Sequence, residues 1–200
     1  SPDINHGSRS SEKVALTFHG AGDPSIASAL LKIFQETSTP VTVFAVGTFL
    51  KANPNFAQEI VNAGHDLGNH TMTHTQMKTI SAKRVDQEIL QCAELLHKLI
   101  GNYGSFFRPS GTQFSTALIR KSAKKFGYQN CISYDVDSKD YLDPGKDAVT
   151  SNVAKATKGG SIISLHFGHK NTVAAMPLII ENLNRKGLKP VTLTELLSSK

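Results

Sequence analysis

The chain has 200 residues, of which 39% are hydrophobic and 19% charged, a balance typical of one globular domain with a substantial core. No run of about 18 apolar residues occurs, so a membrane span is not expected, and no signal peptide is recognisable at the start. The formal charge is +6, but the lysines are dispersed and no nucleic-acid recognition motif is present, so no nucleic-acid partner is expected.

The first third of the chain predicts a polar tail and then alternating strands and helices. Residues 1–12 are polar and aperiodic, which indicates a tail ahead of a domain over residues 13–200. Ser25 can cap a helix whose apolar residues keep helical spacing. A second helical segment ends at Gly64. The strands predicted from continuous apolar or β-branched runs are 14–18, 41–46 and 65–69, the last one breaking at Gly68.

The rest of the chain continues this alternation. Ser81 can cap a long helix that ends at Gly101, and its apolar residues step by four and three, the strongest helix signal in the chain. The other predicted helices are 115–126, 147–158, 173–185 and 194–198, and the predicted strands are 106–109, 128–134, 161–166 and 189–193.

Alternation of about seven apolar strands with helices predicts a single-domain α/β fold with a parallel sheet. Neither a G-x-G-x-x-G nor a P-loop pattern opens any helix, because His19-Gly20-Ala21-Gly22 is too short and lacks the later glycine. A barrel of about seven βα units is therefore preferred to a doubly wound sheet.

The chain has two cysteines. Cys92 falls on the apolar stripe of a predicted helix and Cys131 in a predicted strand, so two buried thiols are expected. A disulfide stays open, and two cysteines do not identify a compartment.

Chemically capable side chains gather where predicted strands end. In a parallel barrel the catalytic groups come from the loops after the carboxyl ends of the strands, so one active site is predicted there. The residues at these ends are His19, Asp23, His70, His74, Arg108, Asp135, Asp137, Asp140 and His166.

His70 and His74 are four residues apart, and on a helical turn such positions share one face. Two imidazoles that face one point can hold Zn²⁺, which needs one more protein ligand to keep an open catalytic position. The residues between them supply no glutamate, so this is not the H-E-x-x-H pattern of zinc proteases.

With these residues in place, the chain resembles the polysaccharide deacetylases of carbohydrate esterase family 4, the NodB-homology domain, from Val14 to about Leu196. The family motif H-(S/T)-x-x-H matches His70–His74, and residues 63–69 resemble its usual lead-in. R-x-P-x-G looks like residues 108–111 with the proline one place early, and D-x-x-D-W resembles residues 137–141 with tyrosine in place of tryptophan. L-x-H is matched at His166 through the histidine alone.

The first family motif, Thr-Phe-Asp-Asp-Gly-Pro, is altered. This chain reads Thr17-Phe18-His19-Gly20-Ala21-Gly22-Asp23-Pro24, so one aspartate is missing and the other is displaced. Three alternatives stay open. Asp23 completes a His-His-Asp metal set with His19 as general base; His19 is the third ligand and Asp23 the base; or the site binds sugar without turning it over.

The resemblance implies a distorted, incomplete (β/α)7-type barrel and a metal-dependent hydrolase that removes N-acetyl or O-acetyl groups from a polysaccharide such as chitin or peptidoglycan. It implies Zn²⁺ or another divalent ion on His70, His74 and Asp23, with His166 as the acid, Asp140 holding His166, and Arg108 orienting the base. The alternative is an inactive carbohydrate-binding pseudoenzyme on the same barrel. The expected substrate is an N-acetylglucosamine polymer, and the protein is expected to be a secreted or cell-surface monomer.

Overall fold

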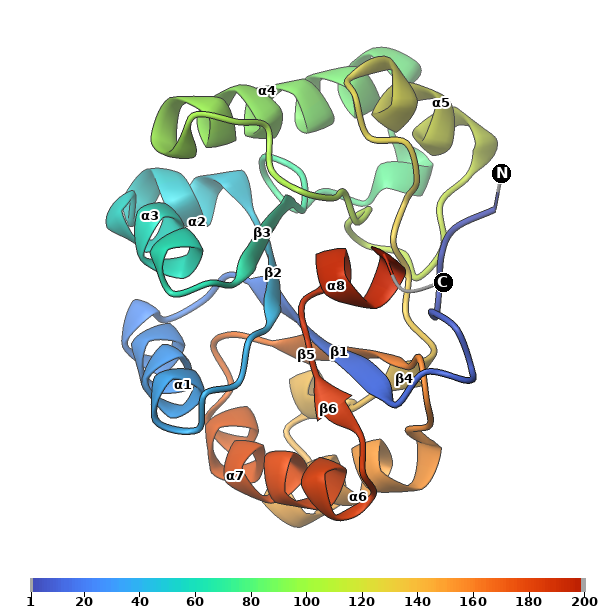
Figure 1. The fold of residues 1–200 in the computed structure, drawn as a ribbon. Helices are drawn as coiled ribbons and strands as arrows, with labels where there is room; N and C mark the ends of the chain where they lie inside the picture. The colour runs from blue at the N-terminus through green and yellow to red at the C-terminus, as the bar shows by residue number, and fades with distance from the viewer. Residues whose placement is uncertain (1, 199–200) are drawn as a thin grey trace.

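Parallel strands form the centre of the molecule and helices surround them in the computed structural model, which describes residues 2–198 (Figure 1). The main path of the sheet runs β3-β2-β1-β5-β4, and β6 pairs with the start of β1. The strands are β1 Lys13–Gly20, β2 Thr42–Ala45, β3 Asp66–Asn69, β4 Val136–Asp137, β5 Ile162–His166 and β6 Lys189–Pro190.

The helices follow the predicted order, with one addition, the short α2. They are α1 Pro24–Glu36, α2 Gly47–Ala52, α3 Asn55–Asn62, α4 Ala82–Ile100, α5 Ala117–Lys125, α6 Lys146–Ala156, α7 Lys170–Arg185 and α8 Leu193–Ser198, with 3₁₀ turns η1 at Met77–Thr79 and η2 at Asp140–Leu142. The caps predicted for α4 are confirmed: the Ser81 hydroxyl accepts from the N–H of Arg84, and Gly101 takes a left-handed φ of 82°.

The prediction of an α/β barrel is confirmed in its parallel strands, but the barrel is not closed. Among the described residues, β3 and β4 are the two edges of the main path. Phe107 continues the sheet past β3 through single bridges to Asn69 and Cys131. The result is the incomplete barrel that the resemblance implies.

Two predicted strands, 106–109 and 128–134, are wrong: the structure has only isolated bridges there. The physical reason lies in Arg108. Its guanidinium donates to the carbonyls of Ile132 and Ser133, so it takes acceptors that a strand ladder would use. Pro109 has no N–H to offer a ladder.

The central strand β1 is buried along nearly its whole length, and this fixes the position of His19 near its end. Phe18 points to the helices, where its ring lies 5.1 Å from that of Phe34 and 5.8 Å from that of Phe167. Because side chains alternate along a strand, Thr17 and His19 point to the opposite face, toward the barrel interior.

The segment predicted as an N-terminal tail lies against the barrel. The N–H of Ile4 donates to the carbonyl of Cys131 at 3.0 Å, and Ile4 accepts in return from Ser133 at 2.7 Å. Arg9 forms an ion pair with Asp135 at 2.7 Å. These contacts hold residues 4–9 against residues 131–135.

Both cysteines are buried free thiols, as predicted, and burial raises the pKa of Cys92 to about 12 and that of Cys131 to about 11. Within residues 2–198, no helix combines the length and the apolar character that crossing a membrane requires.

Candidate active site

The turn that carries His70 and His74 follows β3 at the carboxyl end of the sheet. It is not helical, contrary to the basis of the prediction. Thr71 and His74 take left-handed φ values of 70° and 56°, and this bend brings the two rings together with centroids 5.0 Å apart. Such backbone costs of order 1 kcal/mol or more at non-glycine residues, so the surroundings must hold it.

Two buried side chains that the sequence analysis did not single out hold this turn. The Asn69 side chain accepts from the N–H of Thr71 at 2.8 Å and donates to the carbonyl of Ile89. Glu88, only 3% exposed, accepts from the backbone and hydroxyl of Thr73. The sequence could have indicated a buried role for Glu88, because it is an acid on the apolar face of α4.

The close approach of α2 to the turn depends on a glycine. The N–H of Gly47 donates to the carbonyl of Thr71 at 2.9 Å, and a Cβ at Gly47 would lie 2.3 Å from the sulfur and 3.0 Å from the Cα of Met72. The first turn of α2 therefore holds the histidine turn on one side, and α4 holds it on the other.

His70 is prepared to bind through Nε2. Its Nδ1 lies 2.9 Å from the carbonyl oxygen of Arg108, so Nδ1–H donates there and Nε2 keeps its lone pair. The ring is 2% exposed. Burial, followed by the neighbouring His74, holds the pKa of His70 well below its usual range, so the ring is neutral at pH 7.

His19 stands beside His70, with ring centroids 4.7 Å apart. Its Nδ1 lies 3.1 Å from the carbonyl of Leu165, and its Nε2 lies 3.3 Å from Nη1 of Arg108. Nδ1–H therefore donates to Leu165, and Nε2 accepts from the guanidinium. Burial, followed by the nearby His166, holds the pKa of His19 well below its usual range.

Arg108 is 1% exposed and its charge has no acidic partner: no carboxylate within residues 2–198 forms an ion pair with it. Its other donors go to the Thr17 hydroxyl at 2.9 Å and to two backbone carbonyls. The guanidinium also lies over the ring of Phe44 at 4.4 Å. Burial lowers its pKa to about 9.

His166 and the buried Asp140 form a pair on the other side of the pocket. Nδ1 of His166 lies 2.8 Å from Oδ1 of Asp140, whose Oδ2 accepts from the backbone of His166 and from the Thr172 hydroxyl at 2.6 Å. Burial opposes the charged form of Asp140, but these hydrogen bonds outweigh it and lower its pKa. The arrangement leaves Nε2 of His166 for the pocket.

Asp23 does not lie with the histidines. Its carboxylate is the N-cap of α1, where it accepts from the backbone and the hydroxyl of Ser25, both at 2.8 Å. These hydrogen bonds lower its pKa. Pro24 at the first helical position favours this capped start, and the carboxylate is committed to it.

The remaining predicted side chains divide between the pocket and its surroundings. Asp135 bonds to Arg9 and Asp137 accepts from the N–H of Lys139, so neither carboxylate faces the histidines. Tyr141 is 44% exposed, with its ring 5.4 Å from that of His166, at the rim of the pocket.

Together these side chains line an open pocket of about 350 Å³ at the carboxyl end of the sheet. Within residues 2–198, no carboxylate lines it. The lining residues are His19, His70, His74, Pro109, Gly111, Thr112, Gln113, Tyr134, Tyr141 and His166.

The donor set fits part of a zinc site. His70 and His74 offer neutral imidazoles, which a zinc-like ion accepts. The third ligand is not in place, because Nε2 of His19 accepts from Arg108 and Asp23 caps α1. Accordingly, no three histidine, cysteine, aspartate or glutamate side chains of the described chain are arranged around one ion.

Comparison with known proteins places this pocket in context. A model of the family described as "Polysaccharide deacetylase" matches residues 6–131. The peptidoglycan-N-acetylglucosamine deacetylase of Bacillus cereus is 32% identical over 94% of this chain and 89% of its own length. The crystal structure of the Bc1960 peptidoglycan N-acetylglucosamine deacetylase superposes with a TM-score of 0.91 at 26% identity, over 98% of this chain and 93% of that one.

A further solved structure with this fold is described differently. It is BA3943 of Bacillus anthracis, described as a CE4 family pseudoenzyme, with a TM-score of 0.90 at 27% identity over 96% of this chain and 68% of that one. The same fold therefore occurs in proteins described as deacetylases and in one described as a pseudoenzyme.

Proposed function

Because this chain belongs to the polysaccharide deacetylase family, we propose that it removes N-acetyl groups from an N-acetylglucosamine polymer such as peptidoglycan. The observation that carries the proposal is the pocket itself: His166, held from behind by the buried Asp140, lines one cavity with His70 and His74. We propose that the protein is a monomer that is secreted or held at the cell surface, where such a polymer lies.

His166 is the proposed general acid. Asp140 holds its Nδ1–H and stabilises the imidazolium, so the proton on Nε2 is directed into the pocket, toward the leaving amine. Thr172 and the backbone of His166 fix Asp140 in turn. Tyr141, at the rim, offers a ring face to the sugar.

We propose Zn²⁺ or another divalent ion as the cofactor, held by His70 and His74, since both imidazoles are neutral and Nε2 of His70 is free. When bound, such an ion polarises the acetyl carbonyl and lowers the pKa of a water ligand. The Arg108 carbonyl orients His70 for this task.

His19 occupies the base position of the family motif, where it is a weak base. Arg108 donates to its Nε2, and burial keeps the ring neutral. A proton can reach it only against the adjacent guanidinium charge, so we expect slow turnover.

The test is acetate release by zinc-replete protein from peptidoglycan and from the trimer of N-acetylglucosamine, here called chitotriose. We expect wild-type release to fall about 100-fold or more in His166→Ala, and in Asp140→Asn by a similar factor, because general acid catalysis is worth 10²–10⁴. Tyr103→Phe, an exposed aromatic on another surface, is the matched control. Unchanged release in His166→Ala would remove that residue as the acid.

A second candidate is sugar binding without turnover. The specific observation in its favour is the His19–Arg108 hydrogen bond in a pocket that no carboxylate of the described chain lines. Calorimetric binding of chitotriose at the pocket, together with no acetate from any acetylated glycan under metal-replete conditions, would establish this candidate and overturn the first.

A further inference from the structure

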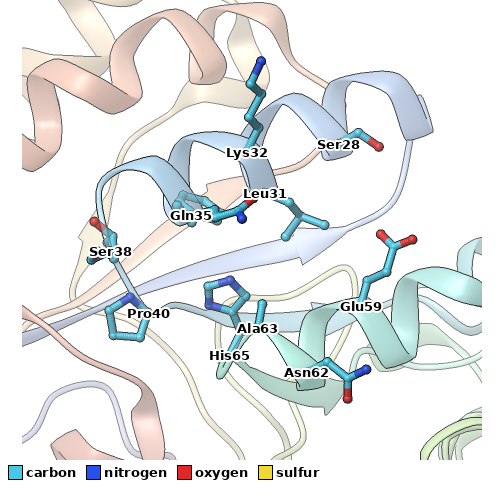
Figure 2. Close-up of a pocket in the computed structure, with 12 residues that line it drawn as sticks. Ser28, Leu31, Lys32, Gln35, Ser38, Pro40, Glu59, Asn62, Ala63 and His65 are labelled. Atoms are coloured by element: carbon cyan, nitrogen blue, oxygen red, sulfur yellow. The ribbon is translucent and has the colours of Figure 1, made fainter.

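A second cavity lies at the opposite end of the strands from the histidine pocket. It is a hollow of about 780 Å³ between α1 and α3, within the range of ligand pockets. Its lining includes Pro40, two residues before β2, and His65, immediately before β3. Figure 2 shows Leu31 and Gln35 of α1 facing Ala63 and His65 across it.

His65 gives this cavity a fixed hydrogen-bond donor. The side chain is 8% exposed, and its Nδ1 accepts from the N–H of Val41 at 3.1 Å, which leaves the proton on Nε2. Every fully buried side-chain nitrogen or oxygen within residues 2–198 has a hydrogen-bond partner, whereas Nε2 of His65 has none among these residues, so this atom is not fully buried. Nε2–H is therefore open to the cavity.

The rest of the lining is suited to a neutral ligand with both apolar and polar faces. Leu31 and Pro40 supply apolar surface, and the amides of Gln35 and Asn62 lie exposed at the sides. The two charged residues of the lining, Lys32 and Glu59, have opposite signs, so the hollow has no net charge to select an ion. Sugar rings with acetamido groups have this mixture of faces.

We infer that the hollow between α1 and α3 is a second saccharide site, in which Nε2–H of His65 donates to an acetamido carbonyl. The inference rests on the proposed function, because it takes the same class of polymer as its ligand. The two cavities lie at opposite ends of the β-strands, so they would hold separate glycan chains of the polymer. Occupation of both sites at once strengthens binding to the polymer without a new contact.

Two measurements test the inference. In long-range ¹H–¹⁵N spectra, we expect the Nε2 signal of His65 to shift when chitotriose is added. In pull-down with insoluble peptidoglycan, we expect Ala63→Trp to weaken binding about tenfold, because the indole fills the hollow. Ala156→Trp, at an exposed helix end on α6, is the matched control.

The outcomes separate this site from the active site. Acetate release from soluble chitotriose should be equal in Ala63→Trp and wild type, because the variant lies away from the histidine pocket. A chitotriose shift confined to His70, His74 and His166, or unchanged pull-down of Ala63→Trp, would overturn the second site and leave the proposed function standing. If the wild type releases no acetate but the His65 signal still shifts, the proposed function is overturned and the second site stands.

Discussion

At the scale of single residues, the altered chemistry of the site comes from His19 and Gly20. His19 faces Arg108, with which no carboxylate of residues 2–198 forms an ion pair. A Cβ at Gly20 would lie 3.0 Å from a methyl of Val43 and 3.1 Å from the Cα of Ala45, so an aspartate there would require these neighbours to shift by a few tenths of an ångström. The position with room for a carboxylate beside the guanidinium is His19.

We therefore predict that His19→Asp binds zinc more tightly than wild type, by about tenfold or more. A unit charge within a few ångströms of the ion gains more than the 1.4 kcal/mol that tenfold requires, even at an effective dielectric of about 20. The measurement is zinc affinity by chelator competition. His19→Asn, which has the same size and no charge, is the control; equal affinities of the two variants would contradict the prediction.

Most of the predicted site residues could be placed from the sequence, because strand ends in a parallel sheet meet at one edge. This holds for His19, His70, His74, Arg108 and His166, which the structure brings together. Asp23 could not be placed, because its competing role as a helix cap depends on local hydrogen bonds with Ser25.

At the scale of elements, Asp23 is a structural part of α1. We predict that Asp23→Ala lowers the free energy of unfolding, as the loss of an N-cap does, whereas Asp23→Ser retains most of the stability because its hydroxyl can cap the helix. Urea unfolding measures both. Zinc content should be the same in both variants and in wild type; a loss of zinc in Asp23→Ser would show that the carboxylate is a ligand after all.

Long helices could be predicted with their ends, because the periodicity and caps of α4 are local properties of its sequence. The strands at 106–109 and 128–134 could not. Their failure comes from the buried guanidinium of Arg108, which takes the carbonyls of Ile132 and Ser133, a tertiary event that no local pattern reports.

At the scale of the whole molecule, buried neutral histidines make stability depend on pH. The folded pKa values of His19 and His70 are well below 6.5, mainly because of burial. Between those values and about 6.5 the unfolded chain binds more protons, so stability falls as the pH drops below about 6.5, by about 1.4 kcal/mol per pH unit for each such ring.

Urea unfolding of metal-stripped protein between pH 7.5 and 5 measures this slope. We expect His19→Gln to flatten it, and His97→Gln, at an exposed position on α4, to leave it unchanged. If stability fell with pH as steeply in His19→Gln as in wild type, the His19 ring would take up its proton without cost in the folded protein.

The parallel α/β fold could be predicted from the alternation of elements, but the incomplete closure could not be derived from it. Closure depends on whether residues near Phe107 and Cys131 form ladders, and here they form single bridges that the N-terminal segment covers.

The central claim is that the histidine pocket deacetylates an N-acetylglucosamine polymer. The most direct measurement is ¹³C NMR of chitotriose labelled in its acetyl methyl groups, incubated with zinc-replete protein. The account predicts that the signal of free acetate grows slowly with wild type and about 100-fold more slowly with His166→Ala. Acetyl signals that broaden on binding while no acetate forms would contradict it.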